Sequence, residues 1–340
     1  MNRTAGTRVL IAGAGYHVPN GIVTNQDIER RVNTTSEFIR SRTGVQERRF
    51  ARKNETLADL IEPAAEAAIR DAGLSADDVD MLIVNTLTPD HHDPSQACLM
   101  QKRLGLRRIP SFDIRAQCTG LLYGMDIAAQ FLQTGKCAHV LVVCAELLSK
   151  RLDTSDAGRN LAVMLGDGAG AVVLSAAPQA SAESAPGLVD LISYADGTHY
   201  SLLCTEAPGS ARPEFLTEAD VRAGLHQFRM QGRPFRDRIE AAMSDVVTEM
   251  LTKHRLTIAD IDVIVPHQAN LRILERLEQQ LAVPPGRLVT TIERFGNMAS
   301  ASMAVALAVA REQGRFVPGR LSLLVGCGSG MTWGAALYRN

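Results

Sequence analysis

Apolar runs with the length of β-strands alternate with helical stretches along most of the chain. The strand-like runs lie at 8–15, 80–86, 111–114, 139–146 and 171–177, and the helical stretches at 56–72, 94–104 and 119–135. Because strands that are separated by helices need crossover connections, this alternation is typical of a largely parallel, buried sheet. The sequence therefore predicts an α/β fold.

The sequence also repeats itself. Residues 74–83, LSADDVDMLI, align with residues 256–265, LTIADIDVIV, at an offset of 182 positions, and each copy follows an amphipathic helix and leads into an apolar strand. A second pair follows in the same order: GDGAGAVVLS at 166–175 and GCGSGMTWGAAL at 326–337 are glycine-rich segments after apolar runs, LAVML and LSLLV, that we interpret as strands. Chance similarity between ordinary α/β units is the alternative, but two pairs in one order favour duplication.

Duplication predicts two similar halves, residues 1–177 and 178–340. The boundary is expected near 176–186, where APQASAESAPG has the composition of a linker. Ligands of such folds bind in the crevice at the carboxyl ends of the strands. In the first half, Cys118 follows the strand SFDI in this position. In the second half, HQANLRI follows the strand DVIVP.

Charge and cysteine usage limit the partners. With 36 basic and 37 acidic residues the net charge is −1, which gives no global field to attract nucleic acid or an anionic membrane. The N-terminal apolar run is broken by glycines, and no run reaches the ~20 apolar residues that span a bilayer. The six cysteines form no CxxC pair, and His91 and His92 lack a second ligand pair with metal spacing. We therefore expect a cytoplasmic protein with reduced thiols and neither a nucleic-acid nor a membrane partner.

Cys118 lies in DIRAQCTGLLYG, between the end of a strand and the start of a helix. A buried cysteine more often packs than reacts. However, a helix N-terminus favours the thiolate over the thiol, and a strand-to-helix turn points the side chain out of the sheet. Packing is the better interpretation for Cys98, Cys137 and Cys144, which lie in or beside apolar runs. Cys118 is therefore the candidate nucleophile.

Three further segments offer hydrogen-bond donors. His267 follows Pro266, which ends its strand because it cannot donate to a sheet ladder, and the repeat places Asn85 at the equivalent strand end. A lone histidine is more often structural than catalytic. Asn297 lies in RFGNMASASM, and an asparagine in such a segment is most often a helix cap or a turn residue. The segment GCGSGMTWG at 326–334 is too rich in glycine for an ordinary helix or strand, so its N–H groups can approach a substrate closely.

Together these groups favour one chemistry. The thiolate would accept an acyl group from a thioester, with the oxyanion held by the N–H groups of Cys118 and Ser329. His267 and Asn297 would donate to the carbonyl of a second thioester, and so stabilise the enolate that forms when a malonyl group loses CO2. A Cys–His pair also serves proteases and hydrolases, but the absence of a GxSxG elbow or papain-like surroundings disfavours these. No metal or redox cofactor is required.

The same segments resemble the β-ketoacyl-[acyl-carrier-protein] synthase III family of thiolase-fold condensing enzymes. The resemblance runs through nearly the whole chain and is carried by SRTGVQERR at 41–49, the Cys118 segment, GDGAGA at 166–171, VPHQANLRI at 265–273, RFGNMASAS at 294–302 and GSGMTWGAALYR at 328–339. It implies a thiolase-like five-layered αβαβα fold from two duplicated halves, a homodimer, and Cys118, His267 and Asn297 as the catalytic residues.

The resemblance also implies binding positions for coenzyme A. Arg42, Thr43 and Asn270 match positions that hold coenzyme A or its pantetheine arm, and Arg272 matches one implicated in carrier-protein docking. Phe38 stands where housekeeping members stack a tryptophan on adenine.

The chain departs from the family in the adenine clamp and in the acyl pocket. The arginine on the other side of adenine is replaced by Ala157, with Arg159 as a candidate substitute. The acyl pocket is expected at Asp93, Cys327 and Met331, and the first two replace phenylalanines of housekeeping members. We therefore expect a wider or differently shaped acyl pocket, which puts acetyl-CoA as the sole primer in doubt.

The expected reaction is a ping-pong decarboxylative Claisen condensation of an acyl-CoA with malonyl-CoA or malonyl-acyl carrier protein, in fatty acid or secondary metabolite biosynthesis. The segments 84–98, 113–124 and 140–151 are similar to the branch that makes 2-aminobenzoylacetyl-CoA from anthraniloyl-CoA for alkylquinolone signals, although shared ancestry with another acyl preference gives the same likeness. Two alternatives stay open: acyl transfer from Cys118 to a hydroxyl or amine without condensation, and a non-catalytic subunit that supports a related synthase.

Overall fold

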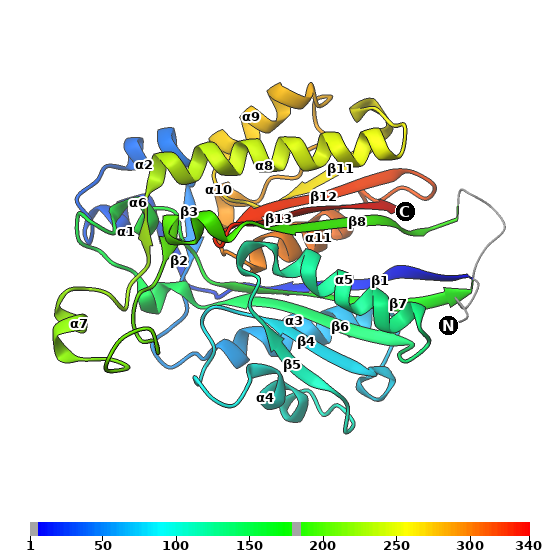
Figure 1. Cartoon of the computed structure of the whole chain (residues 1–340), viewed down its shortest axis with the longest axis horizontal. Coiled ribbons are helices and arrows are strands. Elements are labelled where there is room, and N and C mark those ends of the chain that lie inside the picture. Colours follow the sequence, from blue (N-terminus) through cyan, green and yellow to red (C-terminus); the bar gives the residue numbers. More distant parts are fainter. Residues whose placement is uncertain (1–5, 179–184) are drawn as a thin grey trace.

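Two sheets stack with helices between them and on both outer faces (Figure 1). A computed structural model of the chain describes residues 6–178 and 185–340. The first sheet has the order β1 (Thr7–His17), β7 (Gly168–Pro178), β6 (His139–Glu146), β4 (Met81–Asn85) and β5 (Ser111–Ile114). The second has the order β11 (Ile261–Pro266), β12 (Leu321–Gly328), β13 (Thr332–Arg339) and β8 (Gly187–Ala195).

The long helices form the other three layers. The central layer is α5 (Gly120–Gln133) and α11 (Ala301–Glu312), the outer layer on the first sheet is α3 (Leu57–Asp71) and α4 (Gln96–Arg103), and the outer layer on the second is α8 (Gly232–Lys253) and α9 (Leu271–Leu281). This arrangement confirms the predicted αβαβα fold. Part of the predicted linker at 176–186 lies outside the described residues.

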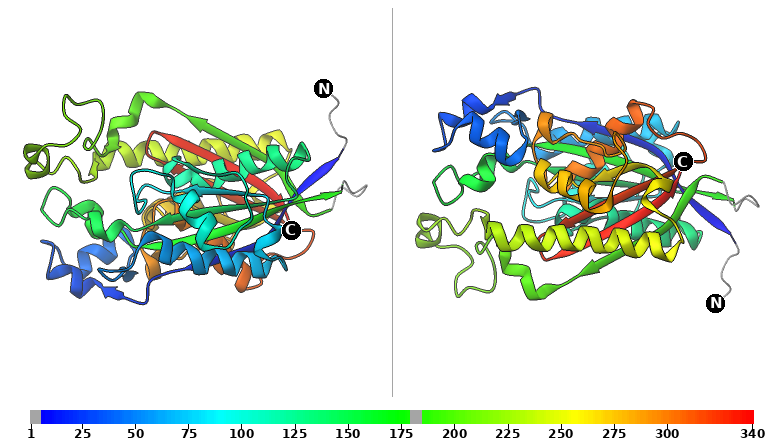
Figure 2. Two further views of the ribbon diagram at one scale, coloured as in Figure 1. Left: turned by 90° about the horizontal axis from the view of Figure 1, so that it is seen from below. Right: turned by 90° about the horizontal axis from the view of Figure 1, so that it is seen from above.

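Short elements complete the chain. Two small ribbons pair β2 (Ile22–Thr24) with β3 (Glu47–Arg49) and β9 (Leu203–Cys204) with β10 (Arg229–Met230). The short helices are α1 (Asn25–Glu29), α2 (Ser36–Thr43), α6 (Arg159–Ala162), α7 (Glu218–Arg222) and α10 (Ile292–Phe295). Figure 2 shows α7 and its flanking loops at the end of the molecule opposite the N-terminus.

The internal repeat is visible in local detail. Before β4, Ser75 and Asp78 form a capping box around a 3₁₀ turn, and before β11, Thr257 and Asp260 form the same box. The offset of 182 positions also relates β6 to β12 and two rare backbone conformations, at Gln117 (φ 48°) and Ala299 (φ 43°). The strand–turn–helix corner that carries Cys118 therefore has a counterpart in the second half.

Three expectations about strands are wrong. The sheets are mixed, since β7 and β13 are antiparallel to both of their neighbours. The segment at 326–334, expected to be too rich in glycine for an ordinary strand, supplies the end of β12 and the start of β13, with a turn at 329–331. Such a short turn can join only antiparallel strands. The run LAVML at 161–165 is the end of α6 and a turn, with one bridge from Leu165 to Asn297.

Close packing of α11 against β7 depends on Gly170. A Cβ at Gly170 would lie 2.6 Å from Ala304 Cβ and 2.7 Å from the backbone nitrogen of Val305, so the helix would have to move. We expect Gly170→Ala to lower the free energy of unfolding by about 1–3 kcal/mol. Gly197→Ala is the matched control, because a Cβ there meets nothing within 4 Å. Denaturant unfolding measures both, and equal stabilities would contradict the packing argument.

Candidate active site

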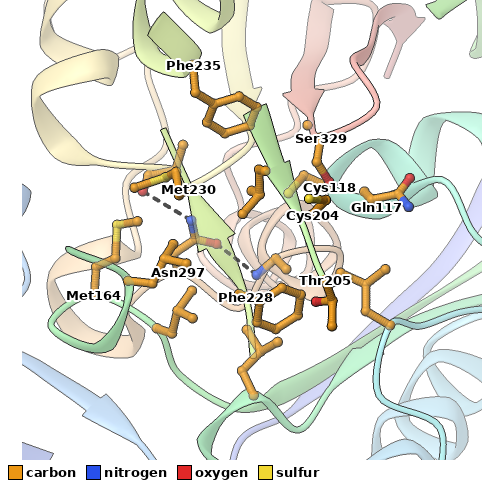
Figure 3. A pocket seen from close by; sticks show the side chains of 18 of the residues that line it. Gln117, Cys118, Met164, Cys204, Thr205, Phe228, Met230, Phe235, Asn297 and Ser329 are labelled. Atoms are coloured by element: carbon orange, nitrogen blue, oxygen red, sulfur yellow. Dashed lines mark hydrogen bonds between the residues drawn. The ribbon is translucent and has the colours of Figure 1, made fainter. Parts of the chain in front are cut away.

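A cavity of about 1030 Å³ opens where the two halves meet, and Cys118, His267 and Asn297 all line it. Figure 3 shows Cys118 and Ser329 on one wall and Asn297 on the opposite one. Cys118 comes from the turn before α5, His267 from the end of β11, and Asn297 from the loop before α11. The structure therefore brings together three residues that are far apart in the sequence.

Asn85 holds the turn that carries Cys118. Cys118 is the central residue of the 3₁₀ turn Gln117–Thr119. The side chain of Asn85, at the end of β4, accepts a hydrogen bond from the backbone N–H of Ala116 (2.8 Å) and donates one to the carbonyl of Gln117 (3.3 Å). These bonds stabilise the left-handed conformation of Gln117 and direct Cys118 into the cavity.

The expectation that the helix start favours a thiolate is wrong for the free site. Burial raises the pKa of Cys118 to about 12, and the charge of Glu146 acts in the same direction. Hydrogen bonds from the N–H groups of Cys118 and Ser329 offset part of this rise. Desolvation outweighs the helix N-terminus, so Cys118 rests as a thiol.

His267 is also uncharged at rest. It follows Pro266, is 1% exposed, and donates its backbone N–H to the carbonyl of Val325 (2.8 Å). Burial lowers the pKa of its imidazole to about 4. Its Nδ1 has no hydrogen-bond partner among the described residues. A neutral imidazole offers one N–H donor and one acceptor nitrogen.

The orientation of the Asn297 side chain is fixed. Its Oδ1 accepts a hydrogen bond from Ala299 N–H (2.8 Å), and its Nδ2 donates one to the carbonyl of Ala269 (3.2 Å). The second hydrogen of Nδ2 has no partner in the described part of the chain. Asn297 thus presents a neutral donor, as in Figure 3, where its two hydrogen bonds are drawn.

The hairpin between β12 and β13 lies directly against Cys118, the candidate nucleophile. A Cβ at Gly328 would lie 2.9 Å from both Cβ and N of Cys118. Only glycine therefore allows β12 to bring the N–H of Ser329 to the thiol.

Four of the five residues expected to bind coenzyme A line the cavity. The four are Phe38, Arg42, Thr43 and Asn270. Arg159 does not line the cavity, but its guanidinium lies 5.9 Å from the centre of the Phe38 ring. Arg42 is 5.7 Å from the same centre. The side chain of Asn270 caps α9 and donates to the carbonyl of Arg42 (3.0 Å), which ties α9 to α2.

Of the residues predicted for the acyl pocket and for carrier-protein docking, only one lines the cavity. Cys327 lines the cavity, but the structure does not place Met331 there, because its side chain is 3% exposed and packs in the core. Asp93 lies in an exposed loop outside the cavity of this chain, and Arg272 is exposed at the start of α9.

Several lining residues were missed by sequence reasoning. Arg151 is the clearest: it donates to the carbonyls of Leu87 (3.1 Å) and His226 (3.4 Å) and lies 4.5 Å from the centre of the Phe228 ring. No motif marks this residue. Glu146, buried close to the cavity, had a signal, because it is an acid at the carboxyl end of an apolar strand.

The charged residues that line the cavity are all basic. They are Arg42, Arg115, Lys150, Arg151 and Arg236, and no aspartate or glutamate is among the described lining residues. Such a lining favours anionic ligands. No group of three or more His, Cys, Asp or Glu side chains in the described ranges is placed to hold a metal ion, and no described helix is long and apolar enough to cross a bilayer.

Gly328→Ala tests the contact between the hairpin and Cys118. We expect at least a roughly tenfold loss of activity, because the new methyl group displaces Cys118 or the N–H of Ser329 and a small misplacement costs up to ~100-fold. Gly209→Ala is the control, since a Cβ there has its nearest neighbour at 3.8 Å. Steady-state rates and thermal melting of both variants are the measurement. Full activity in Gly328→Ala would show that this contact does not shape the site.

Comparison with known proteins agrees with the geometry. The family model described as 3-oxoacyl-[acyl-carrier-protein (ACP)] synthase III matches residues 112–197. The family model of the C-terminal part of the same synthase matches residues 251–340. The chain is 38% identical over 329 residues to β-ketoacyl-[acyl-carrier-protein] synthase III of Caldanaerobacter subterraneus (97% of each chain), and 39% identical over 335 residues to that of Thioalkalivibrio sulfidiphilus (98% and 99%).

Solved structures show the same fold. The 3-oxoacyl-[acyl-carrier-protein] synthase III of Aquifex aeolicus superposes with a TM-score of 0.87 at 35% identity, covering 98% of this chain and all of the other. The priming β-ketosynthase of the R1128 polyketide pathway superposes with a TM-score of 0.87 at 30% identity, covering 98% and 97%. The chain therefore belongs to the 3-oxoacyl-[acyl-carrier-protein] synthase III family and is a condensing acyltransferase.

Proposed function

We propose that Cys118, His267 and Asn297 carry out a two-step condensation. In the first step the sulfur of Cys118 bonds to the acyl carbon of an acyl-CoA, and coenzyme A leaves as the thiol. In the second step a malonyl thioester loses CO2, and its carbanion attacks the acyl group on Cys118, which forms the new C–C bond of a β-ketoacyl thioester and breaks the C–S bond. The Cys118 thiolate that leaves takes up a proton from solvent and returns to the thiol. The supporting observation is that the nucleophile and two neutral donors from the other half line one cavity.

The acylation step needs a proton acceptor, because Cys118 rests as a thiol. His267, with its pKa lowered by burial, is a neutral base at physiological pH and lines the same cavity. We assign it to take the proton and return it to the departing thiolate of coenzyme A. The N–H groups of Cys118 and Ser329 would hold the oxyanion.

The decarboxylation step needs hydrogen-bond donors at the oxygen of the malonyl thioester. An enolate forms on the thioester oxygen as CO2 leaves, and the N–H groups of His267 and Asn297 would stabilise it. Asn297 is suited to this role, since the bond from Ala299 to Oδ1 fixes which end of the amide faces the thioester.

The substrates are proposed to be coenzyme A thioesters, for which the basic lining is suited. Phe38, with Arg42 and Arg159 beside its ring, would stack on the adenine, and Arg42 would contact phosphate. Delivery of malonyl by acyl carrier protein is proposed from the exposed Arg272. A homodimer is proposed through β5, which is one of the two edge strands of its sheet. The cytoplasmic location stays a prediction.

We also propose a starter larger than acetyl. Thr205 and Phe228 line the cavity together with Cys118 (Figure 3), and Cys327, which the resemblance places where housekeeping members have a phenylalanine, lines it too and leaves room for a larger acyl group. A panel of acyl-CoAs from acetyl to anthraniloyl, scored by intact mass of the Cys118 adduct, tests this. Acylation by acetyl-CoA alone would contradict it.

Asn297→Ala separates the two steps. The acyl-enzyme should still form, because Asn297 acts only on the malonyl thioester, while condensation should fall by about 10²–10³-fold, typical of the loss of one such donor. Cys118→Ser should form no stable acyl-enzyme, and Asn33→Ala, at an exposed site, is the control. Intact mass and CO2 release are the readouts. Equal loss of both steps in Asn297→Ala would argue against the assignment, and product formation without malonyl thioester would indicate simple acyl transfer.

Phe38→Ala tests the adenine clamp. We expect KM for acyl-CoA to rise roughly 3–10-fold with kcat little changed, since stacking binds the nucleotide equally in the ground and transition states. Arg40→Ala, an exposed residue on the same helix, serves as the control. An unchanged KM in Phe38→Ala would remove Phe38 from the binding site.

A further inference from the structure

Glu146 is a fully buried carboxylate that the proposed mechanism does not use. It ends β6, has no exposed surface, and accepts hydrogen bonds from Ser300 Oγ (2.6 Å), Thr88 Oγ1 (3.0 Å) and the backbone N–H of Leu87 (3.0 Å). A carboxylate is expensive to bury, and this one forms no ion pair with a described residue. Its environment therefore calls for an explanation beyond packing.

The internal repeat shows what Glu146 replaces. At the offset of 182 positions, Cys118 corresponds to Ser300 and Glu146 corresponds to Gly328. In one corner Gly328 lies against Cys118 and leaves room for substrate. In the other corner the carboxylate of Glu146 occupies the equivalent place and binds Ser300. Glu146 thus closes the second corner and joins the two halves there.

The partners of Glu146 belong to the segments that position the catalytic residues. Ser300 follows Asn297 in the loop before α11, and its Oγ also lies 3.4 Å from the carbonyl of Asn85. Leu87 and Thr88 continue from Asn85, whose side chain holds the turn of Cys118. One carboxylate therefore connects the Asn297 loop to the nucleophile turn.

Glu146 also acts on Cys118 through its charge. Burial raises the pKa of Glu146 to about 7, against the hydrogen bonds from Ser300, Leu87 and Thr88 and the positive charge of Arg151. Its negative charge in turn raises the pKa values of Cys118 and Cys144. The charged and titratable groups around it are thus Arg151, with Arg115 next to Arg151, and the two thiols.

We propose that Glu146 is a positioning residue of the condensing site, which ties the Asn297 loop to the nucleophile turn through its hydrogen bonds. Its negative charge adds to burial in opposing ionisation of the Cys118 thiol. The proposal rests on the proposed role of Cys118 as nucleophile. Glu146 forms no bond to substrate.

The proposal makes a specific claim about pH. As pH rises through about 7, Glu146 loses its proton, and the new charge makes the Cys118 thiol harder to ionise. The rate of thiolate reactions at Cys118 should therefore climb less than tenfold per pH unit between roughly pH 6 and 8, the range of one coupled titration. With no charge at position 146 the climb should be an even tenfold per unit.

Alkylation of Cys118 by iodoacetamide, followed by peptide mass spectrometry from pH 5.5 to 8.5, tests this without any turnover. For Glu146→Gln we expect faster alkylation than wild type at pH 8, on the order of tenfold for each pKa unit of coupling, and no inflection near pH 7. Asp167→Asn is the matched control: Asp167 is equally buried and bonded to Ser149 and Ala51, but its charge does not act on Cys118. It should keep the wild-type profile.

A purely structural role predicts a different outcome. In Glu146→Gln we expect acylation by acyl-CoA to speed up while decarboxylation of the malonyl thioester slows, because the Asn297 loop is held less firmly. A structural defect would slow both steps. An unchanged alkylation rate and inflection in Glu146→Gln would overturn the proposal, whereas normal alkylation behaviour without condensation would instead count against the proposed function.

Ser300→Ala covers the case in which Glu146→Gln does not fold. The variant keeps the carboxylate but removes the donor that lowers its pKa, so the inflection in the alkylation profile should move to higher pH. An inflection at the wild-type position would overturn the proposal.

Discussion

The structure depends on two sheets closing on one shared pair of helices. The helices of this central layer pack closely against the strands because glycines lie at the contacts. Gly170 lies against Ala304, and a Cβ at Gly124 would lie 2.5 Å from Val142 Cγ1. Because α5 and α11 both belong to this central layer, the Cys118 turn before α5 and the Asn297 loop before α11 face each other across it. The candidate active site follows from this closure, since neither half alone contains both Cys118, the proposed nucleophile, and the proposed donors His267 and Asn297.

The closure also sets the electrostatics. The site is buried, so the thiol of Cys118 and the imidazole of His267 both rest uncharged, and Asn297 is neutral by nature. The cavity around them carries only basic charge among its described lining residues. In the proposed mechanism, anionic thioesters are therefore attracted to a site whose catalytic groups have no charge. New charge forms only on the reacting atoms, where fixed N–H groups stabilise it.

The sequence predicted the fold class, because strand periodicity is a local signal. Local motifs also pointed to Cys118, His267 and Asn297, which the structure brings to one cavity and whose catalytic roles stay a proposal. The resemblance supplied the layers. Strand direction was missed, since the hairpin at 329–331 was interpreted as a loop that approaches substrate. The thiolate expectation was wrong because burial depends on both halves. For the same reason Arg151 was not predicted to line the cavity, and Met331 was wrongly predicted to do so. Arg151 lies in the cavity and Met331 outside it through contacts that no local pattern encodes.

The most direct test of the account is a crystal structure of the enzyme acylated on Cys118 and soaked with a malonyl thioester analogue that cannot lose CO2. The account predicts the acyl oxygen within hydrogen-bonding distance of the N–H groups of Cys118 and Ser329, and the thioester oxygen of the analogue between His267 and Asn297 Nδ2. An analogue whose thioester oxygen lies away from both His267 and Asn297 would contradict it.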